Sequence, residues 1–350
     1  MLPSGVFSTK YQTETAILRT RTQWLLLAAF LAFVFCVPAF ASGYWIGWVT
    51  RLAIVIIAVM GLHILTGLAG QLSLGHAGFV LVGAYMPGIL TKEWGINGWL
   101  CLPISILGAG IAGVIFGLPA FRLKGFHLAV STLAASYIIR WILQHFSSVT
   151  GGFTGIGRPP LIVGGIDFSS RGVLYAVTIV MLILATIAAK NIQRRATGRA
   201  FVAIRDNELA AQVGGIAIFR YKMLAFFIAC MFAGLAGWLW AYAQPRINPD
   251  SFTAGDSMLW LGILIIGGMG STTGVFIGVI FIRGIQLVFS DYLNPFIATF
   301  LPQSLTQQVY VALSLIVVGI IIVAFMLYEP HGLYSRWQKI KAYYRRYPYS

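Results

Sequence analysis

The sequence has few charged residues and very few acidic ones. Lys, Arg, Asp and Glu together make up 9% of its 350 residues, and only nine are Asp or Glu. Water-soluble domains carry roughly 25% charged residues. Because 59% of the chain is hydrophobic, it has too little polar surface to cover a water-soluble particle. A lipid bilayer removes this contradiction, since helices that face lipid need no polar outer surface.

Carboxylates are scarce in the apolar stretches. Between Glu14 and Asp167 the only acidic residue is Glu93, which falls in a predicted outer loop. Proton- and sodium-coupled carriers commonly place ionisable residues inside the membrane, so ion coupling is disfavoured, although backbone carbonyls can also bind sodium. A lipid-modifying membrane enzyme is disfavoured more strongly. Acid–base or metal chemistry needs clusters of Asp, Glu or His, and the one close acidic pair, Asp206 and Glu208, has no histidine near it in sequence.

Nucleotide-binding and redox motifs are also missing. None of the seven lysines follows a glycine and precedes Ser or Thr, so the sequence has no Walker A motif. Any ATP would therefore be bound and hydrolysed by another polypeptide, and we expect no cofactor in this chain. The three cysteines, Cys36, Cys101 and Cys230, are far apart and lie in apolar runs. They form no disulfide framework and no metal-binding pair, and we interpret them as packing residues.

Long apolar runs dominate what is present. A span needs roughly 20 apolar residues, so we predict an all-α integral membrane protein with about ten transmembrane crossings in one bundle. The expected spans are Trp24–Phe40, Leu52–Leu68, Gly67–Leu90, Trp99–Phe121, His127–Phe146, Gly172–Ala189, Met223–Tyr242, a short piece and a full span within Met258–Phe289, and Val309–Leu327.

The positive charge indicates the orientation. The net charge of +15 is concentrated at the N-terminus, in the segment 190–222 and in the C-terminal tail. Cationic residues beside apolar spans follow the positive-inside rule, so we expect both termini in the cytoplasm of a bacterial cell, with the spans in its inner membrane. Membrane-flanking charge of this kind also makes nucleic acid an unlikely partner.

This topology divides the chain into three parts. They are a cytoplasmic N-terminal segment 1–23, a transmembrane domain 24–328 that contains the cytoplasmic loop 190–222, and a basic cytoplasmic tail 329–350. Residues 39–41 read Ala-Phe-Ala, which resembles a signal-peptidase site. We expect an uncleaved first helix, because the preceding basic region is long and many spans follow.

Two apolar segments are interrupted by glycine clusters, at 67–78 and at 267–278. Paired interruptions indicate broken helices that expose backbone dipoles near the membrane centre, and they predict an internal inverted repeat. The alternative is close packing of helices on glycine. Polar residues inside the clusters favour a substrate pathway formed by Gln71, Ser73, His76, Ser271 and Thr272.

Three of the polar residues have a structural alternative. His76 is equally interpreted as a buried histidine bonded to a backbone carbonyl, and Gln71 and Ser73 can tie a broken backbone together. Two arginines, Arg140 and Arg283, fall within or at the ends of predicted spans. For both we expect snorkelling toward the interface, while contact with a substrate carboxylate is an alternative for Arg140.

The longest predicted cytoplasmic loop contains a short helix at 200–213, which ends at Gly214 and Gly215. At helical spacing Val202, Leu209 and Val213 share one stripe. Such a helix suits the groove of a partner protein, or it could lie on lipid headgroups.

The segment Gly198-Arg-Ala-Phe-Val-Ala-Ile-Arg-Asp-Asn-Glu-Leu-Ala-Ala-Gln-Val-Gly-Gly-Ile216 resembles the coupling loop of branched-chain amino acid ABC permeases. The segment Gly67-Leu-Ala-Gly-Gln-Leu-Ser-Leu-Gly-His-Ala-Gly-Phe79 is similar to that family's most recognisable stretch. Gly267-Gly-Met-Gly-Ser271 and Tyr328-Glu-Pro-His-Gly-Leu333 resemble its later motifs. The resemblance implies that coupling to the ATPase involves Arg199, Arg205, Glu208, Ala211 and Gly215.

The same resemblance implies the partners. They are a second related permease, two cytoplasmic ATPase subunits, a periplasmic substrate-binding protein and the lipid bilayer. The implied substrate is a branched-chain amino acid, with urea, amides or aromatic acids as alternatives in the same family. A passive channel for a small polar solute remains a rival on composition alone, but such a channel has no use for a docking helix in the loop 190–222.

Overall fold

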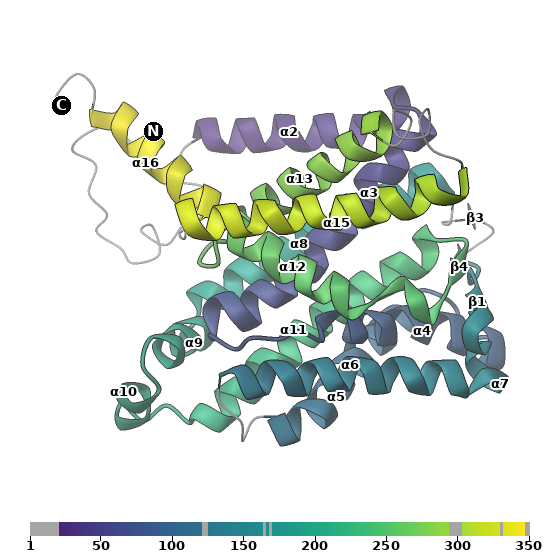
Figure 1. Ribbon diagram of the computed structural model, residues 1–350, viewed down its shortest axis with the longest axis horizontal. Coiled ribbons are helices and arrows are strands. Elements are labelled where there is room, and N and C mark those ends of the chain that lie inside the picture. Colours follow the sequence, from purple (N-terminus) through teal and green to yellow (C-terminus); the bar gives the residue numbers. More distant parts are fainter. Residues whose placement is uncertain are drawn as a thin grey trace.

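A computed structural model describes residues 21–120, 125–163, 166–167, 170–293, 303–329 and 332–346. The described chain is almost entirely helical (Figure 1). Its helices are α2 (Arg21–Phe40), α3 (Gly43–Leu62), η1 (His63–Leu68), α4 (His76–Trp94), α5 (Cys101–Ala120), α6 (Phe126–His145), α7 (Ser147–Thr150), η2 (Gly152–Thr154), α8 (Arg171–Arg194), α9 (Ala196–Asp206), α10 (Glu208–Val213), α11 (Ile218–Ala243), η3 (Pro249–Ser251), α12 (Ala254–Gly267), α13 (Thr272–Val288), η4 (Phe289–Leu293), α15 (Gln303–Tyr328) and α16 (Gly332–Arg346).

Four two-residue strands pair at one end of the molecule. They are β1 (Ile156–Gly157), β2 (Ile162–Val163), β3 (Ile166–Asp167) and β4 (Arg246–Ile247). Strand β1 is antiparallel to β4, and β2 is antiparallel to β3. Strands β1 and β4, with the short helix α7, lie at the right of Figure 1, whereas α9, α10 and α16 lie at the left. The described parts of the predicted cytoplasmic loop and tail are therefore gathered at the end opposite to the strands, and the predicted N-terminal segment lies almost wholly outside the described residues.

The apolar runs form helices because only a helix bonds all its backbone groups inside one segment. Among the described residues, five helices are long and apolar enough to cross a membrane: Gly43–Leu68, Cys101–Leu118, Arg171–Arg194, Ile218–Ala243 and Thr272–Tyr292. A sixth is added if Ile316–Tyr328 and Gly332–Tyr343, which meet at a bend of 48°, count as one span. The chain is thus an all-α, multi-pass membrane protein.

The predicted ten crossings and the inverted repeat are not established by these helices. Each expected span overlaps a helix of the structure, but the span expected at Gly67–Leu90 is helical as α4 only from His76. Helix α12 has only 14 residues, fewer than the roughly 20 that cross a bilayer. The span expected at Trp24–Phe40 lies within α2, which covers Arg21–Phe40. Within the predicted tail, residues 332–346 form helix α16.

Helix α11 is the centre of the bundle and packs against α3, α4 and α5. Its buried side chains include Trp238, Tyr242 and Phe226, all less than 2% exposed. Gly83 of α4 meets Gly234 of α11 so closely that a Cβ on Gly83 would lie 2.6 Å from the Gly234 Cα. Small residues let these two helices approach to backbone contact, as is common in membrane bundles.

The outer helices expose apolar side chains. Helices α2, α5, α6, α8 and α15 carry exposed Leu, Ile, Val, Phe and Trp side chains along their length, which suits contact with lipid or with a second subunit. Cys101 and Cys230 are buried, as expected for packing residues, but Cys36 is exposed on α2. The prediction for Cys36 was therefore wrong, because α2 lies at the edge of the bundle.

Candidate functional site: two broken helices and the loop beside them

The first glycine cluster breaks the chain between α3 and α4. Helix α3 widens into a π-helix at His63–Leu68, and residues 69–75 are not helical. Gly70 takes a φ of +69°, which requires glycine. The freed backbone is bonded locally, since the Gln71 N–H donates to the Leu65 oxygen at 3.1 Å and the Thr66 hydroxyl donates to the Gln71 oxygen at 2.9 Å. Short π-helical turns often mark functional sites.

The second glycine cluster separates α12 from α13. Helix α12 ends at Gly267, and Gly268 has a φ of +108°. Ser271 then caps α13, because its hydroxyl accepts from the backbone N–H of Thr273 at 3.1 Å and of Gly274 at 3.4 Å. Thr272, at the first position of α13, is buried. Both sequence-predicted interruptions are therefore present as broken helices.

The two broken segments touch each other. A Cβ placed on Gly67 would lie 2.1 Å from the carbonyl oxygen of Met269 and 2.7 Å from Nδ1 of His63. Only glycine allows this approach, which brings backbone of the two interruptions together across 202 residues of sequence. On the other side, Gly332 of α16 lies against the backbone of Gly268. His63, fully buried one helical turn before Gly67, was not singled out from the sequence.

The predicted pathway residues of the first break are all buried. Gln71 donates through Nε2 to the Lys222 backbone oxygen at 3.2 Å. His76 bonds through Nε2 to the Ala58 backbone oxygen at 3.0 Å, the structural alternative that the sequence left open. Nevertheless, Gln71 Oε1, Ser73 Oγ and His76 Nδ1 are buried and have no hydrogen-bond partner within the described chain. Unsatisfied buried polar atoms are costly, so these three atoms are candidates for contact with water or solute.

The structure separates the pathway residues into two groups. Gln71, Ser73 and His76 belong to the first break, whereas the Ser271 hydroxyl is occupied as the cap of α13. Ser257 of α12, fully buried, joins α12 to the first break by accepting from the Ala77 N–H at 2.9 Å. The ring of Trp260 meets the His76 ring edge-on, with centroids 6.2 Å apart. The sequence alone indicated neither Ser257 nor Trp260, since Ser257 lies 180 residues after Ala77 and Trp260 follows shortly after it.

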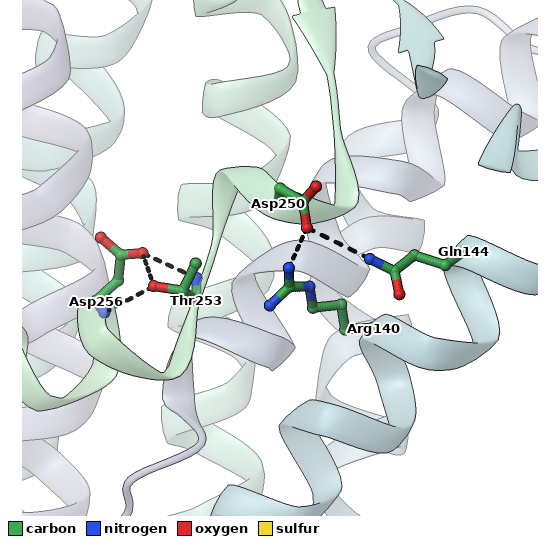
Figure 2. A network of polar contacts seen from close by, with 5 residues as sticks. All are labelled: Arg140, Gln144, Asp250, Thr253 and Asp256. Atoms are coloured by element: carbon green, nitrogen blue, oxygen red, sulfur yellow. Dashed lines mark hydrogen bonds and ion pairs between the residues drawn. The ribbon is translucent and has the colours of Figure 1, made fainter. Parts of the chain in front are cut away.

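Arg140 is not free to bind a substrate carboxylate. Its guanidinium is paired with Asp250 of η3, and Gln144 Nε2 donates to the same carboxylate at 3.3 Å (Figure 2). Beside this pair, Thr253 and Asp256 form a reciprocal capping box at the start of α12. These contacts hold the connection between α11 and α12 against α6, so the alternative role for Arg140 loses its support.

The loop helix predicted at 200–213 is two helices. Helix α9 ends at Asp206, Asn207 is extended with φ −160° and ψ 108°, and α10 begins at Glu208. The cause is local, because Asn207 Oδ1 accepts from the Ala210 N–H at 3.0 Å and caps α10. The predicted stop is confirmed. Gly215, with φ +82°, donates to Gln212, and Ile216 donates to Ala211 in a Schellman motif.

The break at Asn207 divides the expected stripe. Phe201 and Ile204 bury α9 against the body of the protein. On α10, Ala211 is buried, whereas Leu209 is 74% exposed and Val213 is 91% exposed. The prediction that Val202, Leu209 and Val213 form one apolar stripe was therefore wrong. The strongly exposed apolar side chains of this loop, Leu209 and Val213, both belong to α10.

Three of the predicted coupling side chains make contacts within the chain. Arg205 Nη1 donates to the Gly67 carbonyl oxygen at 2.8 Å, and the same guanidinium pairs with Asp206. The Lys222 ammonium donates to the Glu208 carboxylate. Arg199 donates to the Arg194 carbonyl oxygen at 3.1 Å. The loop is therefore bonded directly to the π-helical turn of the first break.

No cluster of three or more His, Cys, Asp or Glu side chains that could hold a metal occurs in the part of the chain that the structure describes. The polar groups at the two breaks are amides, hydroxyls, imidazoles and backbone carbonyls. Such groups can bind a solute or line its path.

The sequence was compared with known families. Residues 44–326 match the family model described as branched-chain amino acid transport system, permease component. The matched range contains both broken segments, the loop 190–222 and α9 and α10. No solved structure matches the chain.

Several curated proteins are similar to the chain. The high-affinity branched-chain amino acid transport system permease protein LivM of Escherichia coli K12 is 31% identical over 341 residues, which cover 90% of this chain and 75% of LivM. The probable branched-chain amino acid transport permease protein LivH of Methanocaldococcus jannaschii is 24% identical, over 75% of this chain and 83% of LivH. The autoinducer 2 import system permease protein LsrC of Enterobacter sp. 638 is 31% identical, over 55% of this chain and 57% of LsrC.

Proposed function

Since the chain belongs to the family of branched-chain amino acid transport system permease components, we propose that it forms half of the pore of an ABC importer in a bacterial inner membrane. In this proposal the importer moves a branched-chain amino acid, or a related small polar solute, into the cytoplasm. ATP hydrolysis in separate subunits drives the transport, so the chain itself binds no nucleotide. It is a transport subunit and not an enzyme.

The observation that carries the proposal is the bond between Arg205 and Gly67. Arg205 is the last but one residue of α9, a cytoplasmic loop helix in the proposed topology, and Gly67 lies in the π-helical turn. A displacement of α9 therefore acts directly on the broken segment, because Arg205 of α9 is bonded to Gly67 with no other helix between them. The broken segment in turn touches the second break through Gly67 and Met269. Coupling through contiguous contacts of this kind needs an element with two arrangements, and a broken helix supplies one.

The surface for the ATPase is α10. Leu209 and Val213 project from a helix whose other side is anchored by Ala211 and by the pair of Glu208 and Lys222. A short helix with exposed apolar side chains fits into a groove of a partner protein. Glu208 at the start of α10 and Arg205 at the end of α9 give the contact a polar edge. In this assembly two ATPases bind two permeases, and a periplasmic binding protein delivers the solute on the opposite side.

The test is dependence on the partners. The chain alone, reconstituted into liposomes, should give no solute uptake, whereas the complex with the second permease, the two ATPases and the binding protein should take up leucine when ATP is supplied. Robust concentrative uptake by the lone chain would end the proposal. A passive channel would be recognised by uptake that equilibrates without ATP.

The likeness to LsrC supports a second candidate solute. LsrC is named as a permease for import of autoinducer 2 and covers just over half of this chain. Uptake assays with the complex should therefore include autoinducer 2 beside leucine.

A further inference from the structure

A cavity of about 370 Å³ opens between α3, α11 and α13, toward the end of the molecule opposite to α9 and α10. We call it the distal cavity. Its lining includes Trp48 and Arg51 of α3, Trp240 of α11, and Arg283 and Gln286 of α13. This volume lies within the roughly 300–1,000 Å³ that is usual for small-molecule sites.

The distal cavity leads to a second, much smaller one. Both cavities are lined by Val55, Trp240 and Arg283, and the smaller one continues to Ala58 and Trp260. These last two residues are the contacts of His76, through its bond to the Ala58 oxygen and its edge-on packing on Trp260. The two cavities therefore share part of their walls, the smaller one borders the residues that contact His76, and Arg283 lines both.

Both basic side chains of the distal cavity lack an acidic partner. Arg283 Nη1 donates to Gln286 Oε1 at 2.9 Å, but its Nε is buried without a hydrogen-bond partner in the described chain. Neither Arg51 nor Arg283 forms an ion pair with any described residue. By contrast, Arg140 is paired with Asp250. The Arg283 guanidinium is held partly out of water, which is unfavourable without an anion, and an anionic ligand would reduce that cost. Arg51 is exposed and keeps its contact with water.

Two carboxylates border the cavities and are already held by other groups. Asp256 lines the smaller cavity, and one of its oxygens accepts from both the N–H and the hydroxyl of Thr253. Asp291 accepts from the hydroxyl of Tyr44, which lines the distal cavity. Neither aspartate forms an ion pair with Arg283, although the charge of Asp256 acts on the Arg283 guanidinium at longer range. The Nε group of Arg283 is still without a hydrogen-bond partner in the described chain and can bind an anion.

We propose that the distal cavity binds the carboxylate group of the transported solute, with Arg283 as its ligand and Arg51 as a second positive charge at the opening. This inference rests on the proposed function and narrows its substrate class to carboxylates. A guanidinium binds a carboxylate through two parallel N–H bonds. Trp48 and Trp240 supply apolar surface for the rest of a small solute. Urea, amides and other uncharged solutes would leave the two guanidinium groups unpaired.

The tryptophans provide a direct assay on the purified complex. Leucine and 4-methylpentanoate, which both carry a carboxylate, should change the intrinsic fluorescence in a saturable way in the absence of binding protein and ATP, whereas leucinamide should not. Arg283→Gln should weaken leucine binding by about tenfold to a hundredfold, the effect of losing a charged hydrogen bond. Arg283→Lys should recover part of the affinity.

Arg171→Gln serves as the matched control, because Arg171 is another arginine at the same end of the bundle but does not line the cavity. It should bind leucine as the unmodified complex does. Equal binding of leucinamide and leucine, or unchanged binding by Arg283→Gln, would overturn the inference. A fluorescence change produced by phosphatidylglycerol and not by leucine would assign Arg283 to a lipid headgroup and would overturn it as well.

The same preparation separates this inference from the proposed function. ATP-dependent leucine uptake with no effect of Arg283→Gln on binding or uptake would refute the carboxylate site and leave the importer intact. Carboxylate binding that requires Arg283, without any ATP-dependent uptake by the full complex, would support the site and refute the importer.

Discussion

The guanidinium of Arg205 donates a hydrogen bond of 2.8 Å to the carbonyl oxygen of Gly67, 138 residues earlier in the chain. This bond crosses from the loop helix α9 to the π-helical turn η1. It pairs a charged donor with a backbone acceptor that the π-helical turn leaves available. We therefore expect it to be a main mechanical connection between the loop and the first broken segment.

The first prediction follows from this bond. Arg205→Gln should leave the complex assembled and its ATPases active, but uptake per ATP hydrolysed should fall about tenfold, since a hydrogen bond to a charged group contributes roughly 1.5–3 kcal/mol. Uptake and phosphate release would be measured together in proteoliposomes. Arg220→Gln is the control, because Arg220 is an exposed arginine at the start of α11 and is not one of the predicted coupling residues. Equal coupling ratios for the two variants would contradict the connection.

A second prediction concerns Glu208 and Lys222. From the sequence, Glu208→Lys would be a surface charge reversal costing no more than about 0.5 kcal/mol. The structure changes this expectation, because the Lys222 side chain is only 12% exposed and pairs with Glu208. The reversal places two ammonium groups together and should cost about 2 kcal/mol. We expect a lower melting temperature, loss of transport and weaker co-purification of the ATPase.

The swap Glu208→Lys with Lys222→Glu separates folding from docking. It should restore the melting temperature, because the ion pair is formed again with its charges exchanged. It should not restore ATPase binding, because position 208 still presents a positive charge to the ATPase. Lys341→Glu in α16 is the control and should spare uptake. If the swap restores transport completely, Glu208 serves only the internal pair.

The third prediction tests the contact between the two breaks. In Gly67→Ala the new Cβ would overlap the Met269 oxygen, whose distance from it would be 2.1 Å. Overpacking of this kind costs about 1–3 kcal/mol, and it would force the two broken segments apart. We expect a fall in melting temperature and in uptake. Gly47→Ala on the same helix has no neighbour within 4 Å of its Cβ, and it should melt at the original temperature or slightly above. A similar result for both variants would show that the approach at Gly67 is unimportant.

The fourth prediction concerns orientation. In a variant without Cys36, Cys101 and Cys230, a cysteine replacing Val213 should react with a membrane-impermeant maleimide only after the inner membrane is opened. Val213 is 91% exposed, so the side of the membrane on which it lies, and not its burial in the protein, decides whether the maleimide reacts. A cysteine replacing Phe153, 68% exposed near the strands at the other end, should react in intact spheroplasts. Efficient labelling at 213 from the periplasmic side would reverse the proposed topology.

The sequence predicted features that depend on local composition. Apolar runs located the long helices, and glycine clusters located both breaks, because a positive φ at Gly70 and Gly268 needs glycine whatever surrounds it. Gly214 and Gly215 correctly indicated the end of α10 for the same reason. The substrate and coupling roles of the residues near them stay predictions.

Features that depend on tertiary contact were not accessible from the sequence. Nothing in the order of residues indicates that Gly67 meets Met269, or that Arg140 meets Asp250 across 110 residues. The division of the loop helix at Asn207 was accessible in principle, since asparagine is a preferred N-cap. The predicted stripe assumes one continuous helix across Asn207. Asn207 in fact ends α9 and caps α10, so residues on its two sides do not share one helical face.

Helix α3 and the π-helical turn η1 form one apolar rod of 26 residues, from Gly43 to Leu68, about 39 Å long at 1.5 Å per residue. Arg51 lies on this rod at the distal cavity, and Gly67 lies at its other end, bonded to Arg205. The rod packs against α11 along its length. A rod that tilts about a fulcrum moves its two ends in opposite directions. In the proposed importer, a tilt of this rod that the loop starts at Gly67 would therefore move the wall of the distal cavity in the opposite direction, and one motion would close one end of the path while it opens the other.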